Sequence, residues 1–212
     1  MKYQYVVWDW NGTLLDDMGF CLDITNRLLM SRGLTPIRDL EDYRERFSFP
    51  VKEYYASLGI GPEVFIPAAH QWMDAYMAGE GACPLQPGAL TLTDRIRDAR
   101  MRQIIISASK QEHLVSQLGT RPRIRDNCPA YGIGDIYAKE KVSLALRVLE
   151  DLKWDRNETV FIGDTLHDAF VAEAAGCGCV LVANGHQSRK RLLTAGVKVC
   201  ADLDEVSDLL FA

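Results

Sequence analysis

Hydrophobic residues fall into two patterns that alternate along most of this chain. Short runs rich in β-branched residues, bounded by polar residues or glycine, predict strands buried on both faces. These runs cover residues 5–8, 104–107, 159–163, 179–183 and 197–200. Most segments between them carry apolar residues at helical spacing, as in "KVSLALRVLEDL" and "DAFVAEAAG". Strands that alternate with helices are connected by right-handed crossovers, so we expect an α/β fold with a doubly wound parallel sheet.

The segment from residue 16 to residue 83 departs from this alternation, because it contains no convincing strand pattern. Apolar residues at helical spacing predict helices over 17–32 and 62–78 instead. We therefore expect an all-helical insert directly after the first strand. On this interpretation residues 1–15 and 84–212 form the α/β core, and residues 16–83 form a second, helical domain.

Composition and charge narrow the range of partners. The chain has 24 Lys and Arg against 29 Asp and Glu, a net charge of -5, so neither nucleic acid nor an anionic membrane is an expected partner. It has no N-terminal signal pattern and no apolar run of the ~18 residues that a spanning helix needs. Its six cysteines form no Cys-x-x-Cys pair. We expect a cytoplasmic protein with reduced thiols, either a monomer or a homodimer.

The candidate chemistry lies just past the predicted strands, because functional groups of an open parallel sheet collect at the carboxyl ends of its strands. Asp9 and Ser107 follow the first and second runs, and Asp164 and Asp168 begin the helix after "VFIG". Carboxylates that converge without arginine neighbours repel one another unless a cation lies among them, and hard oxygen ligands suit Mg²⁺. A site of this kind indicates a phosphate-bearing ligand.

Several nearby groups are suited to bind that phosphate. Ser107 and Thr13 offer hydroxyl donors, and the backbone amides around Gly12 could add more. The stretch "YAKEKVSLAL" places Lys139 and Lys141 at the start of a predicted helix, where the helix dipole favours an anion. The residues alone leave open which of these two lysines would contact the phosphate.

The order of these motifs resembles that of the haloacid dehalogenase superfamily of phosphohydrolases. The matching elements are "DWNGTL", a serine that ends the second strand, a lysine that opens a helix, and "GDTLHD", and together they extend over essentially the whole chain. The resemblance implies a Rossmann-like core and a small helical cap formed by the insert. The stretch "LVANGHQSRKRLLTAG" is similar to that of phosphoglycolate phosphatase-like members, which implies a small phosphorylated metabolite as substrate.

The resemblance also implies roles for individual residues. Asp9 would be the nucleophile that becomes an aspartyl-phosphate. Four groups would hold Mg²⁺: Asp9, the backbone carbonyl of Asn11, Asp164, and Asp168 either directly or through water. Four residues would bind the phosphoryl group: Thr13, Ser107, Ala108 and Lys141, with Lys139 as the alternative to Lys141.

Position 11 departs from the family's phosphatases, which carry a second aspartate there. That aspartate protonates the leaving oxygen and then activates water against the aspartyl-phosphate. Asn11 can form hydrogen bonds but cannot transfer a proton. This chain therefore has no general acid or base at position 11. Loss of such a group typically lowers the rate of catalysis ~10²- to 10⁴-fold.

Three functions are compatible with this set of residues. The first is a slow or selective Mg²⁺-dependent phosphatase that acts on small phosphate esters. The second is a dehalogenase, since that branch also replaces the second aspartate, but dehalogenation needs no metal. The third is a catalytically impaired protein that binds phosphate or a partner, although such a protein has little physical need for the complete set. We expect the phosphatase.

The helical insert contains no recognisable ligand site. Four large side chains in it are interpreted as core packing rather than a substrate pocket: Tyr54, Tyr55, Trp72 and Met73. The polar residues available there to contact a substrate are Arg44, Arg46, Lys52 and His70. Outside the insert, His113 and His167 are interpreted as surface or helix-cap residues.

Overall fold

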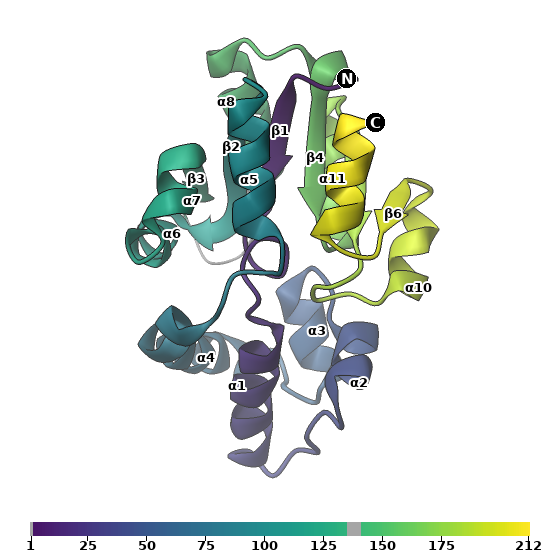
Figure 1. Ribbon diagram of the computed structural model, residues 1–212. Helices are drawn as coiled ribbons and strands as arrows, with labels where there is room; N and C mark the ends of the chain where they lie inside the picture. Colours follow the sequence, from purple (N-terminus) through teal and green to yellow (C-terminus); the bar gives the residue numbers. More distant parts are fainter. Residues whose placement is uncertain (1, 135–140) are drawn as a thin grey trace.

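The centre of the molecule is a parallel β-sheet (Figure 1), seen in a computed structural model that describes residues 2–134 and 141–212. The described residues form six strands in the order β3-β2-β1-β4-β5-β6, and every pair of neighbours is parallel. The strands are β1 (Tyr5–Trp8), β2 (Arg102–Lys110), β3 (Ala130–Ile133), β4 (Thr159–Gly163), β5 (Gly178–Val182) and β6 (Lys198–Cys200). This sheet confirms the predicted α/β fold.

The sequence pattern missed β3 and shortened β2. Strand β3 is the four-residue edge strand "AYGI", in which only Ile133 is fully buried, so it lacks the continuous apolar run that marks the other strands. Strand β2 extends three residues beyond the predicted end, through "ASK". The remaining four strands lie within one residue of their predicted positions.

Helices cover both faces of the sheet. On one face α5 (Ala89–Asp98), α6 (Gln111–Gly119), α7 (Pro122–Asn127) and α11 (Leu203–Phe211) pack against side chains such as Val6 and Trp8. On the other, α8 (Lys141–Leu152) and α9 (Leu166–Ala175) pack against Val7. Successive strand residues point to opposite faces, so β1 contributes to both cores. The shorter helices of this part are η2 (Arg156–Glu158), α10 (Arg189–Leu192) and η3 (Leu193–Ala195).

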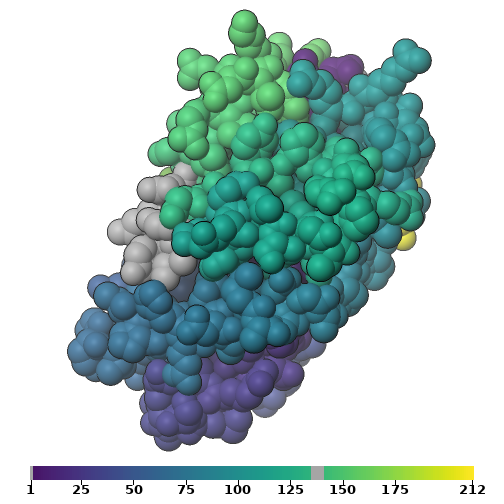
Figure 2. Space-filling view, turned by 90° about the vertical axis from the view of Figure 1, so that its left-hand side faces the viewer, coloured from purple at the N-terminus to yellow at the C-terminus, as the bar shows by residue number. Residues whose placement is uncertain are grey.

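The insert forms helices with a hydrophobic cluster of their own. These are α1 (Met18–Met30), α2 (Leu40–Arg46), α3 (Val51–Ser57), α4 (Phe65–Gly79) and η1 (Glu80–Ala82). They lie beyond the carboxyl ends of the strands (Figure 1), and the segment that contains α4 lies directly against the core segment that contains α6 (Figure 2). The division into domains at residues 16 and 83 stays a prediction.

No helix of the described residues is both long enough and apolar enough to cross a membrane.

Candidate active site

Three carboxylates meet where β1 and β4 end, and two of them, Asp164 and Asp168, are buried. Asp9 directly follows β1, and its amide donates to the carbonyl of Ile162 in β4 (2.8 Å). Asp164 directly follows β4, and Asp168 lies in the first turn of α9, where it accepts hydrogen bonds from the amide and hydroxyl of Thr165. One oxygen from each carboxylate lies within 4.8 Å of the others. The expected convergence of the three acids is present because β1 and β4 are neighbours in the sheet.

Lys141 is the first residue of α8, and its side chain lies among these acids. Its Nζ donates to Asp9 Oδ1 (2.5 Å) and to Asp168 Oδ1 (2.6 Å), and the residue is 2% exposed. The alternative, Lys139, lies outside the described residues. Ser107 and Ala108, near the end of β2, line the same cavity as Asp9. The hydroxyl of Ser107 accepts a hydrogen bond from the backbone amide of Ser109 (3.0 Å).

The charges at this site are not balanced by the side chains alone. Burial raises the pKa of Asp9 to about 8 even though Lys141 opposes the shift, and burial raises the pKa of Asp164 to about 6. Burial also disfavours the charged form of Asp168, but Lys141 and the hydroxyl of Thr165 together outweigh burial, so the pKa of Asp168 is lowered. In their ionised forms the three carboxylates and the ammonium together carry a charge of -2, so one divalent cation would stabilise the ionised forms that burial disfavours. The all-oxygen donor set therefore fits Mg²⁺.

The side chain of Asp164 fits between two glycines that have no side chain to clash with it. A Cβ atom at Gly12 would lie 2.3 Å from Asp164 Oδ2, and one at Gly185 would lie 2.2 Å from the same oxygen. Gly12 also has a φ of +78°, a conformation that other residues rarely adopt. Both loops can approach the carboxylate closely only because these positions lack side chains.

The hydroxyl of Thr13 contacts one of the three carboxylates. Its side chain is fully buried, and its hydroxyl donates to Asp164 Oδ1 (2.8 Å). It is not among the residues that line the cavity. The turn after β1 directs the hydroxyl toward Asp164, so in this structure Thr13 positions that carboxylate.

Asn11 joins three parts of the chain through its side-chain amide. Its Nδ2 donates to Asp17 Oδ2 (2.8 Å) and to the hydroxyl of Tyr76 in α4 (2.7 Å). Its Oδ1 accepts from the hydroxyl of Ser109 in β2 (2.8 Å). An amide offers both a donor and an acceptor, whereas a carboxylate offers only acceptors. This arrangement therefore uses the amide of Asn11, and it places another carboxylate, Asp17, directly beside it.

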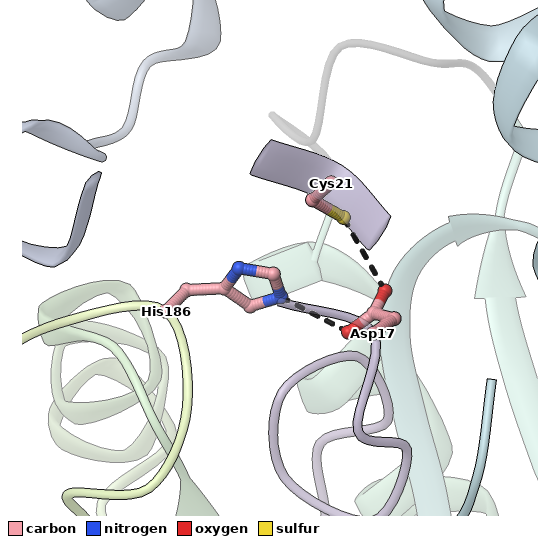
Figure 3. Close-up of side chains that lie close together, drawn as sticks. All are labelled: Asp17, Cys21 and His186. Atoms are coloured by element: carbon pink, nitrogen blue, oxygen red, sulfur yellow. Dashed lines mark hydrogen bonds and ion pairs between the residues drawn. The ribbon is translucent and has the colours of Figure 1, made fainter. Parts of the chain in front are cut away.

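Asp17 lies at the centre of a buried polar cluster that the sequence pattern did not reveal (Figure 3). Its Oδ1 lies 3.2 Å from Nε2 of His186, and the thiol of Cys21 donates to its Oδ2 (3.7 Å). Although burial opposes it, Asp17 raises the pKa of His186 to about 9, and the histidine in turn lowers the pKa of Asp17. His186 Nδ1 lies 2.9 Å from the Tyr43 hydroxyl. The only sequence signal for this pair was the position of His186 just past a strand end.

A cavity of about 190 Å³ opens between the acids and the helical insert. Four side chains interpreted as core packing belong to the insert's hydrophobic cluster or pack against it, as expected, and they also border this cavity: Tyr54, Tyr55, Trp72 and Met73. His113 and His167 also line it and are not merely surface residues. Four polar candidates are not among the lining residues: Arg44, Arg46, Lys52 and His70. Arg44 instead donates to the backbone carbonyls of Asn184 and Gly185.

The family is established by comparison with known proteins. A family model described as a haloacid dehalogenase-like hydrolase matches residues 3–176. The chain therefore belongs to the haloacid dehalogenase-like hydrolase family, and it is a hydrolase. This confirms the family that the order of motifs indicated.

Individual relatives agree over nearly the whole chain. A phosphoglycolate phosphatase of Synechococcus elongatus is 24% identical over 220 residues, which cover 99% of this chain and 96% of that protein. A haloacid dehalogenase-like hydrolase of Streptococcus pneumoniae has a TM-score of 0.84 at 16% identity, covering 99% of each chain. Protein tyrosine kinase A of Mycobacterium tuberculosis has a TM-score of 0.82 at 23% identity, covering 100% of this chain and 99% of that one. These structural likenesses show a common fold, which does not by itself decide the reaction.

Proposed function

We propose that this hydrolase is a Mg²⁺-dependent phosphatase that acts on small phosphate monoesters through an aspartyl-phosphate on Asp9. The observation that carries the proposal is the cluster of Asp9, Asp164 and Asp168 around Lys141 at the carboxyl end of the sheet. The phosphoglycolate phosphatase of Synechococcus elongatus makes small phosphate esters the natural starting class.

In the first step, Asp9 attacks phosphorus in line with the leaving oxygen, and its carboxylate forms a new O–P bond. Lys141 has two functions here: it lowers the pKa of Asp9, which favours the ionised nucleophile, and it brings a positive charge to the transferring phosphoryl group. Ser107 and the backbone beside Ala108 line the cavity where phosphoryl oxygens would be bound. When bound, Mg²⁺ would be held by Asp9, Asp164, Asp168 and the carbonyl of Asn11, and would neutralise charge on the phosphoryl oxygens.

Asn11 determines what happens next. Its amide is not acidic enough to protonate the leaving oxygen and cannot remove a proton from water. The leaving group must therefore depart as an anion, and water must attack the aspartyl-phosphate without a base at this position. We expect both steps to be slowed and phospho-Asp9 to accumulate. A dehalogenase has no use for the excess negative charge around Asp164 and Asp168, so the phosphatase is the better supported function.

The test is hydrolysis of a generic aryl phosphate with and without Mg²⁺. We expect turnover by the native chain only with Mg²⁺, and a loss of roughly 10³-fold or more in Asp9→Asn, because the nucleophile is removed. Asp16→Asn is the matched control, since Asp16 is a nearby acid that does not line the cavity. Folded native protein without turnover, or Asp9→Asn with native activity, would contradict the proposal.

A further inference from the structure

The cavity has an aromatic wall on the side of the helical insert. We use this name for six side chains that line the cavity: Phe47, Phe49, Tyr54, Trp72, Met73 and Tyr76. Their rings contact one another, with Trp72 stacked on Tyr76 (5.1 Å between centroids) and Phe47 in edge contact with Tyr54 (5.3 Å). Phe49 lies 4.8 Å from the ring of His167 at the start of α9, so the wall reaches across to the core.

Part of this wall is open to a ligand. Phe47, Phe49, Trp72 and Met73 are only half-buried although they border the cavity. Apolar side chains that line a concave site in this way offer surface that an apolar part of a ligand can cover. The wall also reaches the candidate reaction site, because the hydroxyl of Tyr76 accepts a hydrogen bond from the side-chain amide of Asn11.

The wall offers no positive charge. Within the described residues, Asp17 is the single charged side chain that the insert contributes to the cavity. The basic groups that line the cavity come from the core: Lys110, His113, Lys141, His167 and His186. Lys141 is held by Asp9 and Asp168, His186 by Asp17, and Lys110 by Glu112.

The remaining two histidines each lie beside another side chain. The ring of His167 lies 4.8 Å from that of Phe49, so it belongs to the aromatic side of the cavity. His113 lies 3.8 Å from Glu112, a carboxylate beside it. On the side of the insert, a substrate carboxylate such as that of phosphoglycolate would therefore lie near Asp17 and an apolar wall, with no cationic side chain of the insert beside it, which is costly.

Asn11 favours the same kind of substrate for an independent reason. Without a proton donor at position 11, the P–O bond breaks readily only if the leaving oxygen is stable as an anion. A phenol ionises with a pKa of about 10, as the tyrosine side chain does, whereas water requires about 15.7 and alkyl alcohols resemble water. A phenolate can leave unprotonated, and its ring matches the aromatic wall.

We infer that the substrate is a phosphate monoester of a small phenol, whose ring packs against the aromatic wall. This inference rests on the proposed function. Asp9 forms an O–P bond as the bond from phosphorus to the aryl oxygen breaks, the electron pair stays on the phenolate, and the phenolate takes a proton from solvent. Water then hydrolyses phospho-Asp9 to release inorganic phosphate and restore the carboxylate.

Three substrates separate the contributions of the ring and of the leaving group. We would measure kcat/KM with Mg²⁺ for phenyl phosphate, cyclohexyl phosphate and phosphoglycolate. We expect phenyl phosphate to exceed phosphoglycolate by about 100-fold, the order expected from burying a ring of this size, and to exceed cyclohexyl phosphate by at least about 10-fold. Cyclohexyl phosphate as good as phenyl phosphate, or phosphoglycolate as good or better, would overturn the assignment to aromatic esters.

A cation placed in the wall should reverse the preference. Met73→Lys should lower kcat/KM for phenyl phosphate by about 10-fold and raise it for phosphoglycolate. Ile66→Lys is the matched control, because Ile66 lies on the same helix, is 55% exposed and does not line the cavity. Equal behaviour of the two variants would count against the role of the wall.

Calorimetric binding of phenylphosphonate and phosphonoacetate, which are not hydrolysed, distinguishes failure of this inference from failure of the proposed function. Tighter binding of phenylphosphonate than of phosphonoacetate supports ring binding by the aromatic wall. If no ester is hydrolysed in that case, only the proposed function is contradicted. Hydrolysis with a preference for phosphoglycolate leaves the phosphatase in place and overturns the aromatic substrate. Absence of both binding and hydrolysis overturns both.

Discussion

Replacing Asn11 with aspartate should destabilise the protein in a pH-dependent way. The amide Nδ2 of Asn11 donates to Asp17 Oδ2 at 2.8 Å, and Asp17 is 1% exposed. Asn11→Asp replaces this donor with an oxygen and creates two carboxylates in contact, one half-buried and one buried. Two ionised groups at 2.8 Å would repel by about 6 kcal/mol at an effective dielectric constant of 20. Taking up one proton at pH 7 costs only about 4 kcal/mol for a carboxyl with an unperturbed pKa near 3.9.

The folded variant therefore takes up one proton rather than holding two ionised carboxylates, and this proton uptake determines the sign of the pH dependence. The pair in the folded Asn11→Asp variant has a pKa above the unfolded value, so its folded state is favoured at low pH and loses stability as pH rises. We expect destabilisation by about 1.5 kcal/mol at pH 5 and about 4 kcal/mol at pH 7, a slope of 1.36 kcal/mol per unit. Urea unfolding at pH 5, 6 and 7, with metal chelated, measures both quantities.

Two further variants make this measurement specific. Asn11→Asp/Asp17→Asn restores an amide beside a carboxylate with the donor and acceptor exchanged, and it should recover most of the stability lost in Asn11→Asp. Asn157→Asp is the control, because Asn157 is an exposed amide beside Asp155 and should change stability by no more than about 0.5 kcal/mol. An Asn11→Asp variant as stable as the native chain at all three pH values would refute the contact between Asn11 and Asp17.

Four other outcomes follow from the site. The pKa of His186 is raised to about 9, so its protonated form stabilises the folded state by about 3 kcal/mol below about pH 6.5, and this stabilisation is lost as the pH rises through 9. His186→Gln should remove this pH dependence from the free energy of unfolding. Gly12→Ala should destabilise by more than Gly33→Ala, because both have positive φ but only Gly12 has Asp164 against its Cβ position, as unfolding midpoints will show. Mg²⁺ at 100 times its Kd should stabilise the native chain by about 2.7 kcal/mol, and Asp164→Asn should lose this effect in thermal scans. Asn11→Asp/Asp17→Asn should hydrolyse an alkyl phosphate faster than the native chain does. An unchanged rate would argue against a missing general acid and base at position 11.

The parts of the site on the sheet were predictable because strand ends are marked in the sequence. Runs such as "YVVW" and "TVFIG" are buried on both faces, and neighbouring parallel strands bring their ends together, so Asp9 and Asp164 could be placed side by side from the pattern alone. The choice of Lys141 over Lys139 depended on the resemblance to the haloacid dehalogenase superfamily, because the residues alone left both lysines open. Strand β3 could not be found, since its glycine and half-exposed residues carry no strand signal.

The parts formed by the insert were not predictable, for a physical reason. Asn11 and Tyr76 are 65 residues apart, and Asp17 and His186 are 169 apart; their contacts depend on how the helices are placed over the sheet. Aromatic residues at helical spacing, such as Trp72 and Tyr76, give the same pattern whether they face a core or a cavity. Whether they contact a substrate is decided only by the gap that the fold leaves between them and the core.

Transfer of the phosphoryl group to Asp9 is tested most directly by rapid mixing with phenyl phosphate and Mg²⁺, followed by acid quenching and peptide mapping. We expect a burst of phenol equal to the amount of enzyme, phosphate release that lags behind it, and a phosphorylated peptide that contains Asp9. Linear release of phenol and phosphate together, with no phosphorylated Asp9 at any time point, would contradict the aspartyl-phosphate and the effect assigned to Asn11.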